Sequence, residues 1–303
     1  EDGFEESLWS DPFDSAEQMS INAFIGRMIG MNKRNSIFID NTADAFIANS
    51  YLDILKHSIS VVTPNKIACS SRQKTYEELK KAAMEHHANF YFETNVGAGL
   101  PVISTLNDLI KSGDRVHKIQ AVLSGSLNFI FNNYDGERSF AEIVRQAKEE
   151  GYTEPDPRED LSGMDVMRKI LILVRESGIA LEPEAVSTEP FIPEICMKAA
   201  TVEKFFEEVS NHENTFVKML EEAKAEGKAL KYVASYEEGN ARTGLEAVGE
   251  KHPFYSLEGK DNIVLFYTKR YSEQPLVIKG AGAGAAVTAS GIFADIMRIA
   301  NSN

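Results

Sequence analysis

The sequence predicts an α/β protein in two parts, a doubly wound parallel sheet followed by an α+β domain. Two observations support this prediction. Short apolar strands alternate with helical segments as far as residue 96, and a mixture of longer strands and helices replaces that pattern afterwards. Regular alternation of strand and helix with short links is typical of parallel βαβ units, whereas the later mixture is typical of an α+β domain.

The first part begins with an acidic stretch and an amphipathic segment at 21–30. Apolar runs predict strands at 36–40, 60–64 and 89–96. Helical spacing of apolar residues predicts helices at 42–58 and 76–87. Helical segments therefore connect successive strands, which allows the strands to run parallel to one another in one sheet.

The second part is longer and less regular. Helices are expected at 101–111, 140–151, 163–177 and 201–227, and extended segments at 116–126, 229–239, 241–250, 262–271 and 275–280. The chain closes with a glycine-rich turn, GAGAG (280–284), and one last helix. We expect residues 1–96 to form the first domain, with 281–303 returning to it, and 97–280 to form the second.

Composition and charge exclude several classes of protein. The 303 residues are 43% hydrophobic and 26% charged, and the formal net charge is −14. A nucleic-acid partner is not expected, because phosphate recognition requires a basic surface. No apolar run approaches the roughly 20 residues of a membrane helix, and the acidic opening does not resemble a signal peptide. Two cysteines far apart, Cys69 and Cys196, suggest reduced thiols, so a cytoplasmic protein is expected.

A dense cluster of charge occurs in TEPDPREDLSGMDVMRK (153–169), just before the apolar run KILILV. One interpretation is structural: Ser162 caps a helix, Asp165 completes a capping box, and Lys169 pairs with Asp165 one turn later. The other is functional: two prolines make a rigid rim that presents Glu154 and Asp156 beside Lys169. Carboxylates and a lysine arranged in this way suit a small zwitterion, and a partly buried lysine can exchange a proton.

Two expected strands end in polar residues. TPNK places Lys66 after the strand at 60–64, and DNTAD places Thr42 after the strand at 36–40. Ligands bind at the carboxyl ends of strands in open α/β sheets, so both residues are candidates for a binding crevice. The alternatives are an exposed turn lysine at position 66 and a helix cap at Thr42.

Two glycine-containing turns are further candidates. In ETNVGAGLP (93–101), Glu93 and neighbouring carbonyl groups offer oxygen ligands for a hard cation, although a tight turn explains the same residues. GAGAG (280–284) follows a strand and precedes a helix, the setting of a phosphate-binding loop. It matches only part of the G-x-G-x-x-G pattern.

Five segments, in this order, resemble motifs of the homoserine dehydrogenase family. They are VVTPNK, ETNVGAGLP, LSGSLNFIF (123–131), GYTEPDPREDLSGMDVMRK and KGAGAGAAVTASGIFAD. The resemblance covers nearly the whole chain from about residue 36, and the match over 151–169 is highly specific. The end of the chain is most similar to the dehydrogenase half of bifunctional aspartokinase–homoserine dehydrogenases.

This resemblance implies reversible hydride transfer between a nicotinamide cofactor, NADP or NAD, and the aspartate-semialdehyde/homoserine pair. Lys66 and Lys169 would be catalytic, and Glu154 and Asp165 would bind the substrate. Thr42, Lys66 and Gly280 would line the cofactor. The implied ligands of a monovalent cation such as Na⁺ are Glu93, Val96, Ala98 and Leu100. A homo-oligomer and an aspartokinase domain in the same polypeptide are the implied partners.

The sequence departs from the family pattern in its first domain. The family opens with a strand, a G-x-G-x-x-G turn and a helix, and the printed sequence contains no such turn. The Rossmann-type domain is therefore expected to be incomplete. Two alternatives stay open: a non-catalytic fragment that binds substrate and dimerises, and a different semialdehyde or amino-acid dehydrogenase of similar fold. Cofactor binding separates the first alternative from an active enzyme.

Overall fold

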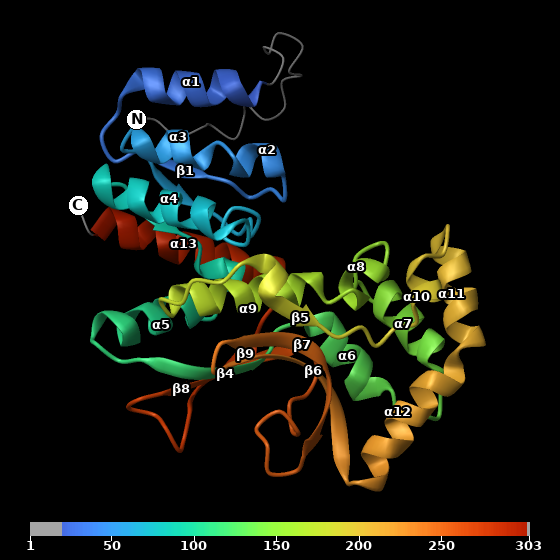
Figure 1. Cartoon of the computed structure of the whole chain (residues 1–303). Coiled ribbons are helices and arrows are strands. Elements are labelled where there is room, and N and C mark those ends of the chain that lie inside the picture. Colours follow the sequence, from blue (N-terminus) through green and yellow to red (C-terminus); the bar gives the residue numbers. More distant parts are fainter. Residues whose placement is uncertain (1–19, 302–303) are drawn as a thin grey trace.

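The computed structural model describes residues 20–301, which form two sheets with helices around them (Figure 1). The first sheet is parallel, in the order β1-β2-β3; its strands are Ile37–Ile39, Ser60–Val62 and Phe90–Tyr91. The second is mixed, in the order β5-β7-β6-β4-β8-β9. Its strands β4 to β9 are Val116–Val122, Val186–Thr188, Lys228–Glu237, Asn240–Gly249, Asp261–Thr268 and Leu276–Ala281. The predicted α/β fold is confirmed.

The prediction of a single helix at 42–58 is wrong, because this segment forms two helices. The helices beside the first sheet are α1 (Ile21–Met31), α2 (Ala45–Ala48), α3 (Tyr51–Lys56) and α4 (Gln73–Glu85). Asp44 caps α2 by accepting from the amide of Ile47, and the helix stops at Asn49. The hydroxyl of Ser50 donates to the carbonyl of Phe46 at 3.3 Å. Side-chain bonds of this kind compete with helical backbone bonds, so the chain turns between α2 and α3.

The strand expected at 89–96 is also too long. β3 contains only two residues, and a short 3₁₀ helix, η3 (Glu93–Asn95), follows it. The buried carboxylate of Glu93 accepts from the amides of Ile103 and Ser104 in the first turn of α5 (Val102–Lys111). A carboxylate at a helix N-terminus satisfies amides that have no partner within the helix. These two hydrogen bonds draw the chain away from the sheet after β3.

The remaining helices surround the second sheet or return to the first. They are α6 (Gly125–Asn133), α7 (Phe140–Glu149), α8 (Arg158–Leu161), α9 (Met164–Glu176), η4 (Pro183–Ala185), α10 (Glu194–Met197), α11 (Val202–Asn211), α12 (Glu213–Ala225) and α13 (Ala285–Asn301). The single helix expected at 201–227 is thus divided at His212. Helix α13 packs against β2 and η3, beside the first sheet (Figure 1). The predicted domain boundaries stay a prediction.

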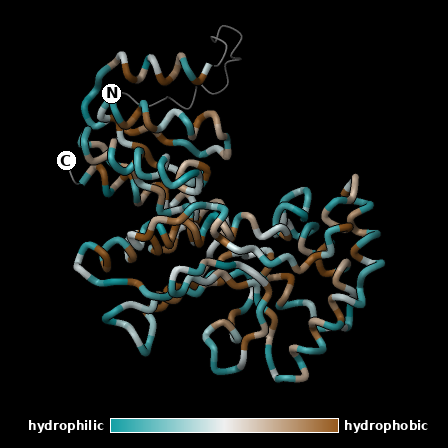
Figure 2. The backbone as a smooth tube through the Cα atoms, in the orientation of Figure 1, coloured by the Kyte–Doolittle hydropathy of each residue, from teal (hydrophilic) through white to brown (hydrophobic). Residues whose placement is uncertain are grey.

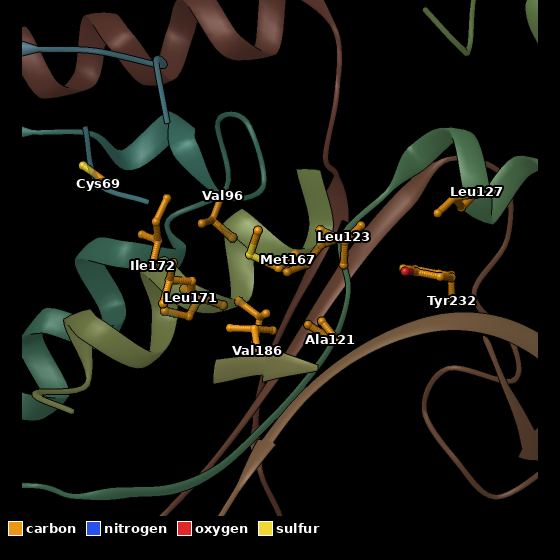
Figure 3. Close-up of a cluster of buried hydrophobic side chains, with 14 of the residues drawn as sticks. Cys69, Val96, Ala121, Leu123, Leu127, Met167, Leu171, Ile172, Val186 and Tyr232 are labelled. Atoms are coloured by element: carbon orange, nitrogen blue, oxygen red, sulfur yellow. The ribbon is translucent and has the colours of Figure 1, made fainter. Parts of the chain in front are cut away.

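Helix α9 links the two sheets. It contacts α5 on one side and β5, β6 and β7 on the other. Most of its side chains are buried, and Met167, Leu171 and Ile172 lie in one apolar cluster with Val96 and Val186 (Figure 3). Hydrophobic segments gather in the same central part of the molecule (Figure 2). Burying this much apolar surface holds the N-terminal end of α9 in a fixed place.

None of the helices in residues 20–301 has the length and apolar character needed to cross a membrane.

Candidate active site

The carboxyl ends of β1 and β2 are joined by a buried polar network. The hydroxyl of Thr63 donates to the carbonyl of Asp40 at 2.9 Å, and the side-chain amide of Asn65 donates to the Asp40 carboxylate at 3.0 Å. The same amide also donates to the carbonyl of Asp44 at 3.0 Å. Buried polar groups with all their partners hold a loop rigidly. Lys66 therefore leaves a fixed turn at the edge of the sheet.

The capping box predicted at Ser162 is wrong. The N-cap of α9 is Gly163, with φ of +71°, and it makes no side-chain cap bond. Ser162 instead ends α8, and its hydroxyl accepts from the amide of Met164 at 3.2 Å. A Cβ atom at position 163 would lie 1.9 Å from the hydroxyl oxygen of Tyr232, so only glycine fits. Asp165 is consequently not part of a cap.

Asp165 lies between two lysines from different parts of the chain. Its carboxylate is 2.7 Å from the Lys169 ammonium, one turn along α9, and 3.2 Å from the Lys66 ammonium. Burial alone would raise the pKa of the Asp165 carboxyl. The two ammonium groups, Lys169 first and Lys66 second, outweigh burial and hold that pKa well below its ordinary value. The predicted Asp165–Lys169 pair is confirmed, and Lys66 joins it.

The Lys169 ammonium is fixed from two directions. It donates to the carbonyl of Leu123 at 2.7 Å as well as to Asp165, and its side chain is only 12% exposed. An ammonium group has three N–H donors. Two of them are used by these acceptors, which leaves one for a ligand. Lys169 lines an open cavity, so that donor has a place to act.

The cavity of about 720 Å³ lies between the two sheets. It is large enough for a small ligand and part of a cofactor. Its lining residues include four that the sequence predicted: Lys66, Glu154, Asp165 and Lys169. They also include Ala43, Ser124, Gly125, Ser126, Tyr152, Glu159, Asp160, Lys260, Gly282, Ala283 and Gly284.

Three residues predicted to contact the substrate or the cofactor lie outside the lining. Thr42 is exposed in the loop before α2, where its hydroxyl accepts from the amide of Asp44 at 3.1 Å; Asp44 is the cap. Gly280 belongs to β9, and the glycines that follow it face the cavity instead. Asp156 bonds to Arg158 at 2.8 Å, which supports the short turn rather than the cavity.

Glu154 differs from the aspartates around it, Asp156, Asp160 and Asp165, whose carboxylates all have partners. Its side chain is exposed at the cavity and, within residues 20–301, its carboxylate has no hydrogen bond or ion pair. Its backbone amide donates to the Asp160 carboxylate at 2.8 Å. The position of Glu154 is therefore fixed while its charge stays free for a cation.

Asp160 is a cavity residue that sequence reasoning missed. It accepts from the hydroxyl of Ser126 on α6 at 2.7 Å and from the amide of Glu154. Burial raises the pKa of the Asp160 carboxyl, and these two hydrogen bonds only partly oppose that effect. Asp160 lies in the charged run and Ser126 in LSGSLNFIF, but only the fold brings the two motifs together.

The predicted cation ligands share one loop between η3 and α5. Val96 and Ala98 are buried there, and Ala98 has φ of +51°. The carboxylate of Glu93 is engaged by the amides of α5 and by Arg298 at 3.1 Å. These partners already use part of the carboxylate's capacity to bind, so a cation here would depend mainly on main-chain carbonyls. Ligation by Glu93, Val96, Ala98 and Leu100 stays a prediction.

Two family models match the chain in tandem. Residues 10–93 match the NAD-binding domain of homoserine dehydrogenase, and residues 101–297 match homoserine dehydrogenase itself. With the two sheets and the lysine–carboxylate cavity, these matches define a protein of the nicotinamide-dependent dehydrogenase class. More particularly, the chain belongs to the homoserine dehydrogenase family.

The curated relatives include both single-function homoserine dehydrogenases and longer bifunctional proteins. The chain is 44% identical over 272 residues to homoserine dehydrogenase of Schizosaccharomyces pombe, covering 87% of this chain and 72% of that one. It is 46% identical over 268 residues to bifunctional aspartokinase/homoserine dehydrogenase 1 of Arabidopsis thaliana, covering 88% of this chain. The chain spans only 29% of that longer relative and 32% of a bifunctional relative from Zea mays.

Solved structures share the fold. A Candida auris protein described as of unknown function is 38% identical, with a TM-score of 0.89 over 95% of this chain and 83% of that one. A mutant of a hyperthermophilic archaeal homoserine dehydrogenase, solved in complex with NADPH, is 25% identical, with a TM-score of 0.68 over 88% and 72%. These likenesses support the fold.

Proposed function

We propose that this chain interconverts L-aspartate 4-semialdehyde and L-homoserine, with NADPH or NADH as the hydride donor. The observation that carries the proposal is the cluster of Lys66, Asp165 and Lys169 at the junction of the two sheets. Family membership and the NADPH complex of an archaeal relative support it. We further propose a cytoplasmic homo-oligomer and, as in the bifunctional relatives, an aspartokinase domain in the same polypeptide.

Each charged side chain has a role in the proposed reaction. A nicotinamide bound in the cavity would supply a hydride for the aldehyde carbon of the semialdehyde. The aldehyde oxygen takes a proton from the Lys169 ammonium as it becomes the alcohol of homoserine. Lys66 adds positive charge beside that oxygen, and Asp165 holds both ammonium groups in position. In the reverse direction Lys169 accepts the proton.

The substrate's own charges fit the rest of the cavity. Glu154 offers a free carboxylate to the α-ammonium group. The first turn of α6, at Gly125 and Ser126, opens on the same cavity, and helix N-termini favour carboxylates. We propose that this turn binds the α-carboxylate. Ala43, near Thr42, and Gly282–Gly284, just beyond Gly280, would hold the cofactor beside it.

Turnover by the unmodified chain tests this function. We expect NADPH or NADH to be oxidised when aspartate semialdehyde is added, and L-homoserine to raise the melting temperature. If neither cofactor is oxidised but homoserine still stabilises the protein, the chain is a non-catalytic substrate-binding unit. If homoserine has no effect either, the cavity is not the substrate site.

Glu154→Gln is expected to weaken substrate binding more than chemistry. A hydrogen bond to a charged group contributes about 1.5–3 kcal/mol, so KM for homoserine should rise about 10- to 100-fold with a smaller change in kcat. Steady-state kinetics of homoserine oxidation measures both constants. Glu221→Gln, an equally exposed carboxylate on α12 outside the cavity, is the matched control. An unchanged KM for the Glu154 variant would remove the residue from the substrate site.

A further inference from the structure

Asn262 is a fully buried polar side chain at the start of β8, beside the cavity. Its side-chain amide nitrogen donates to the carbonyl of Leu123 at 3.3 Å. Its amide oxygen has no partner; within residues 20–301 only the Thr94 hydroxyl shares that condition. A buried polar atom without a partner costs free energy, so an apolar side chain of this size would be the cheaper core residue.

The one bond that Asn262 makes leads to the catalytic cluster. The carbonyl of Leu123 accepts from the Asn262 amide on one side and from the Lys169 ammonium, at 2.7 Å, on the other. The strand pairing Val122↔Ile263 places Leu123 next to Asn262 at the end of β4. A carbonyl oxygen has two lone pairs and can accept both donors. Asn262 thus fixes the acceptor that holds Lys169.

Asn262 also supports the glycine loop. A Cβ atom at Gly282 would lie 2.0 Å from the side-chain carbonyl carbon of Asn262, so the amide fills the space directly beneath that loop. Gly282 itself lines the cavity. One side chain therefore contacts the loop proposed to hold the cofactor and the carbonyl that holds the proton donor.

We propose that Asn262 is a positioning residue for Lys169, which it holds through the Leu123 carbonyl; this inference rests on the proposed function. Without the Asn262 amide, the Leu123 carbonyl can rotate and the Lys169 ammonium loses a fixed acceptor. The proton donor is then misplaced relative to the aldehyde oxygen, and misplacement on the order of 1 Å is enough to slow a reaction about 100-fold.

The variant Asn262→Leu tests the proposal, because leucine has similar volume and cannot donate to Leu123. We expect kcat to fall about 10- to 100-fold, with KM for the semialdehyde and for NADPH changed less than about threefold. The matched control is Thr268→Val, at the other end of β8, where an equally buried hydroxyl donates to Asp114 at 2.7 Å. It should keep the unmodified kcat.

A second measurement does not depend on turnover. Lysines are labelled biosynthetically with carbon-13 at Cε, which leaves the ammonium group unmodified, and the Lys169 Cε resonance is identified by its loss in Lys169→Arg. We expect Asn262→Leu to move this resonance and Thr268→Val to leave it in place. If the unmodified chain shows no turnover, the proposed function fails while the resonance still tests the positioning role.

Three results would overturn the proposal. One is an Asn262→Leu variant with unmodified kcat. Another is a lowered kcat with an unmoved Lys169 resonance, since Asn262 would then act by another route. The third is a large rise in the KM for NADPH at constant kcat, which would assign Asn262 to the glycine loop alone.

Discussion

Alanine in place of Lys169 should lower kcat by about 10²- to 10⁴-fold, the usual contribution of a positioned acid or base. The reason is geometric: Lys169 is held by Asp165 and by the Leu123 carbonyl, with one N–H left for the substrate oxygen. The fold should survive, because Lys66 still neutralises Asp165. Steady-state kinetics gives kcat, and a thermal melt reports the fold.

Lys169→Arg separates charge from proton transfer. A guanidinium keeps the positive charge but does not release its proton at the pH of the assay. This variant should therefore be nearly as slow as the alanine variant. Lys218→Ala removes an exposed lysine on α12 whose only ion pair within residues 20–301 is with Glu222 at 3.8 Å, and it should have unmodified turnover. A Lys169→Ala enzyme within tenfold of the original kcat would contradict the assigned role.

The second large effect is expected for Gly163→Ala, at the start of α9. The added Cβ would meet the buried Tyr232 hydroxyl oxygen at 1.9 Å, and φ of +71° is itself unfavourable for alanine. Left-handed strain costs about 1–2 kcal/mol and overpacking about 1–3 kcal/mol. We expect the free energy of unfolding to fall by about 3 kcal/mol in urea titrations. Because Asp165 lies two residues further on, kcat should fall too.

Gly178→Ala isolates the steric part of this effect. Gly178 has a similar φ of +83°, yet in the described part of the chain no neighbouring atom lies within 4 Å of the place where its Cβ would be. Its replacement should cost only the backbone strain, about 1–2 kcal/mol, and leave kcat unchanged. Equal losses of stability in the two variants would show that the contact with Tyr232 does not restrict position 163.

The cavity could be predicted only in part from local sequence. Lys66, Glu154, Asp165 and Lys169 were all candidates because each follows a strand end or lies in the charged run, and all four line the cavity. The wrong cap at Ser162 has a plain cause. The usual Ser-x-x-Asp spacing was present, but the buried Tyr232 leaves room only for glycine at the next position, and the helix starts there.

By itself, the sequence determined the fold class, the Asp165–Lys169 pair and the family resemblance. These depend on the period of apolar residues and on spacing within one helix, which are local properties. Tertiary structure alone decided which distant residues meet: Lys66 with Asp165 between the two sheets, Ser126 with Asp160 between α6 and α8, and Asn262 with the Leu123 carbonyl where β8 pairs with β4. Such contacts join residues 34 to 139 positions apart. The packing of helices and the pairing of strands create them, and no short stretch of sequence contains that information.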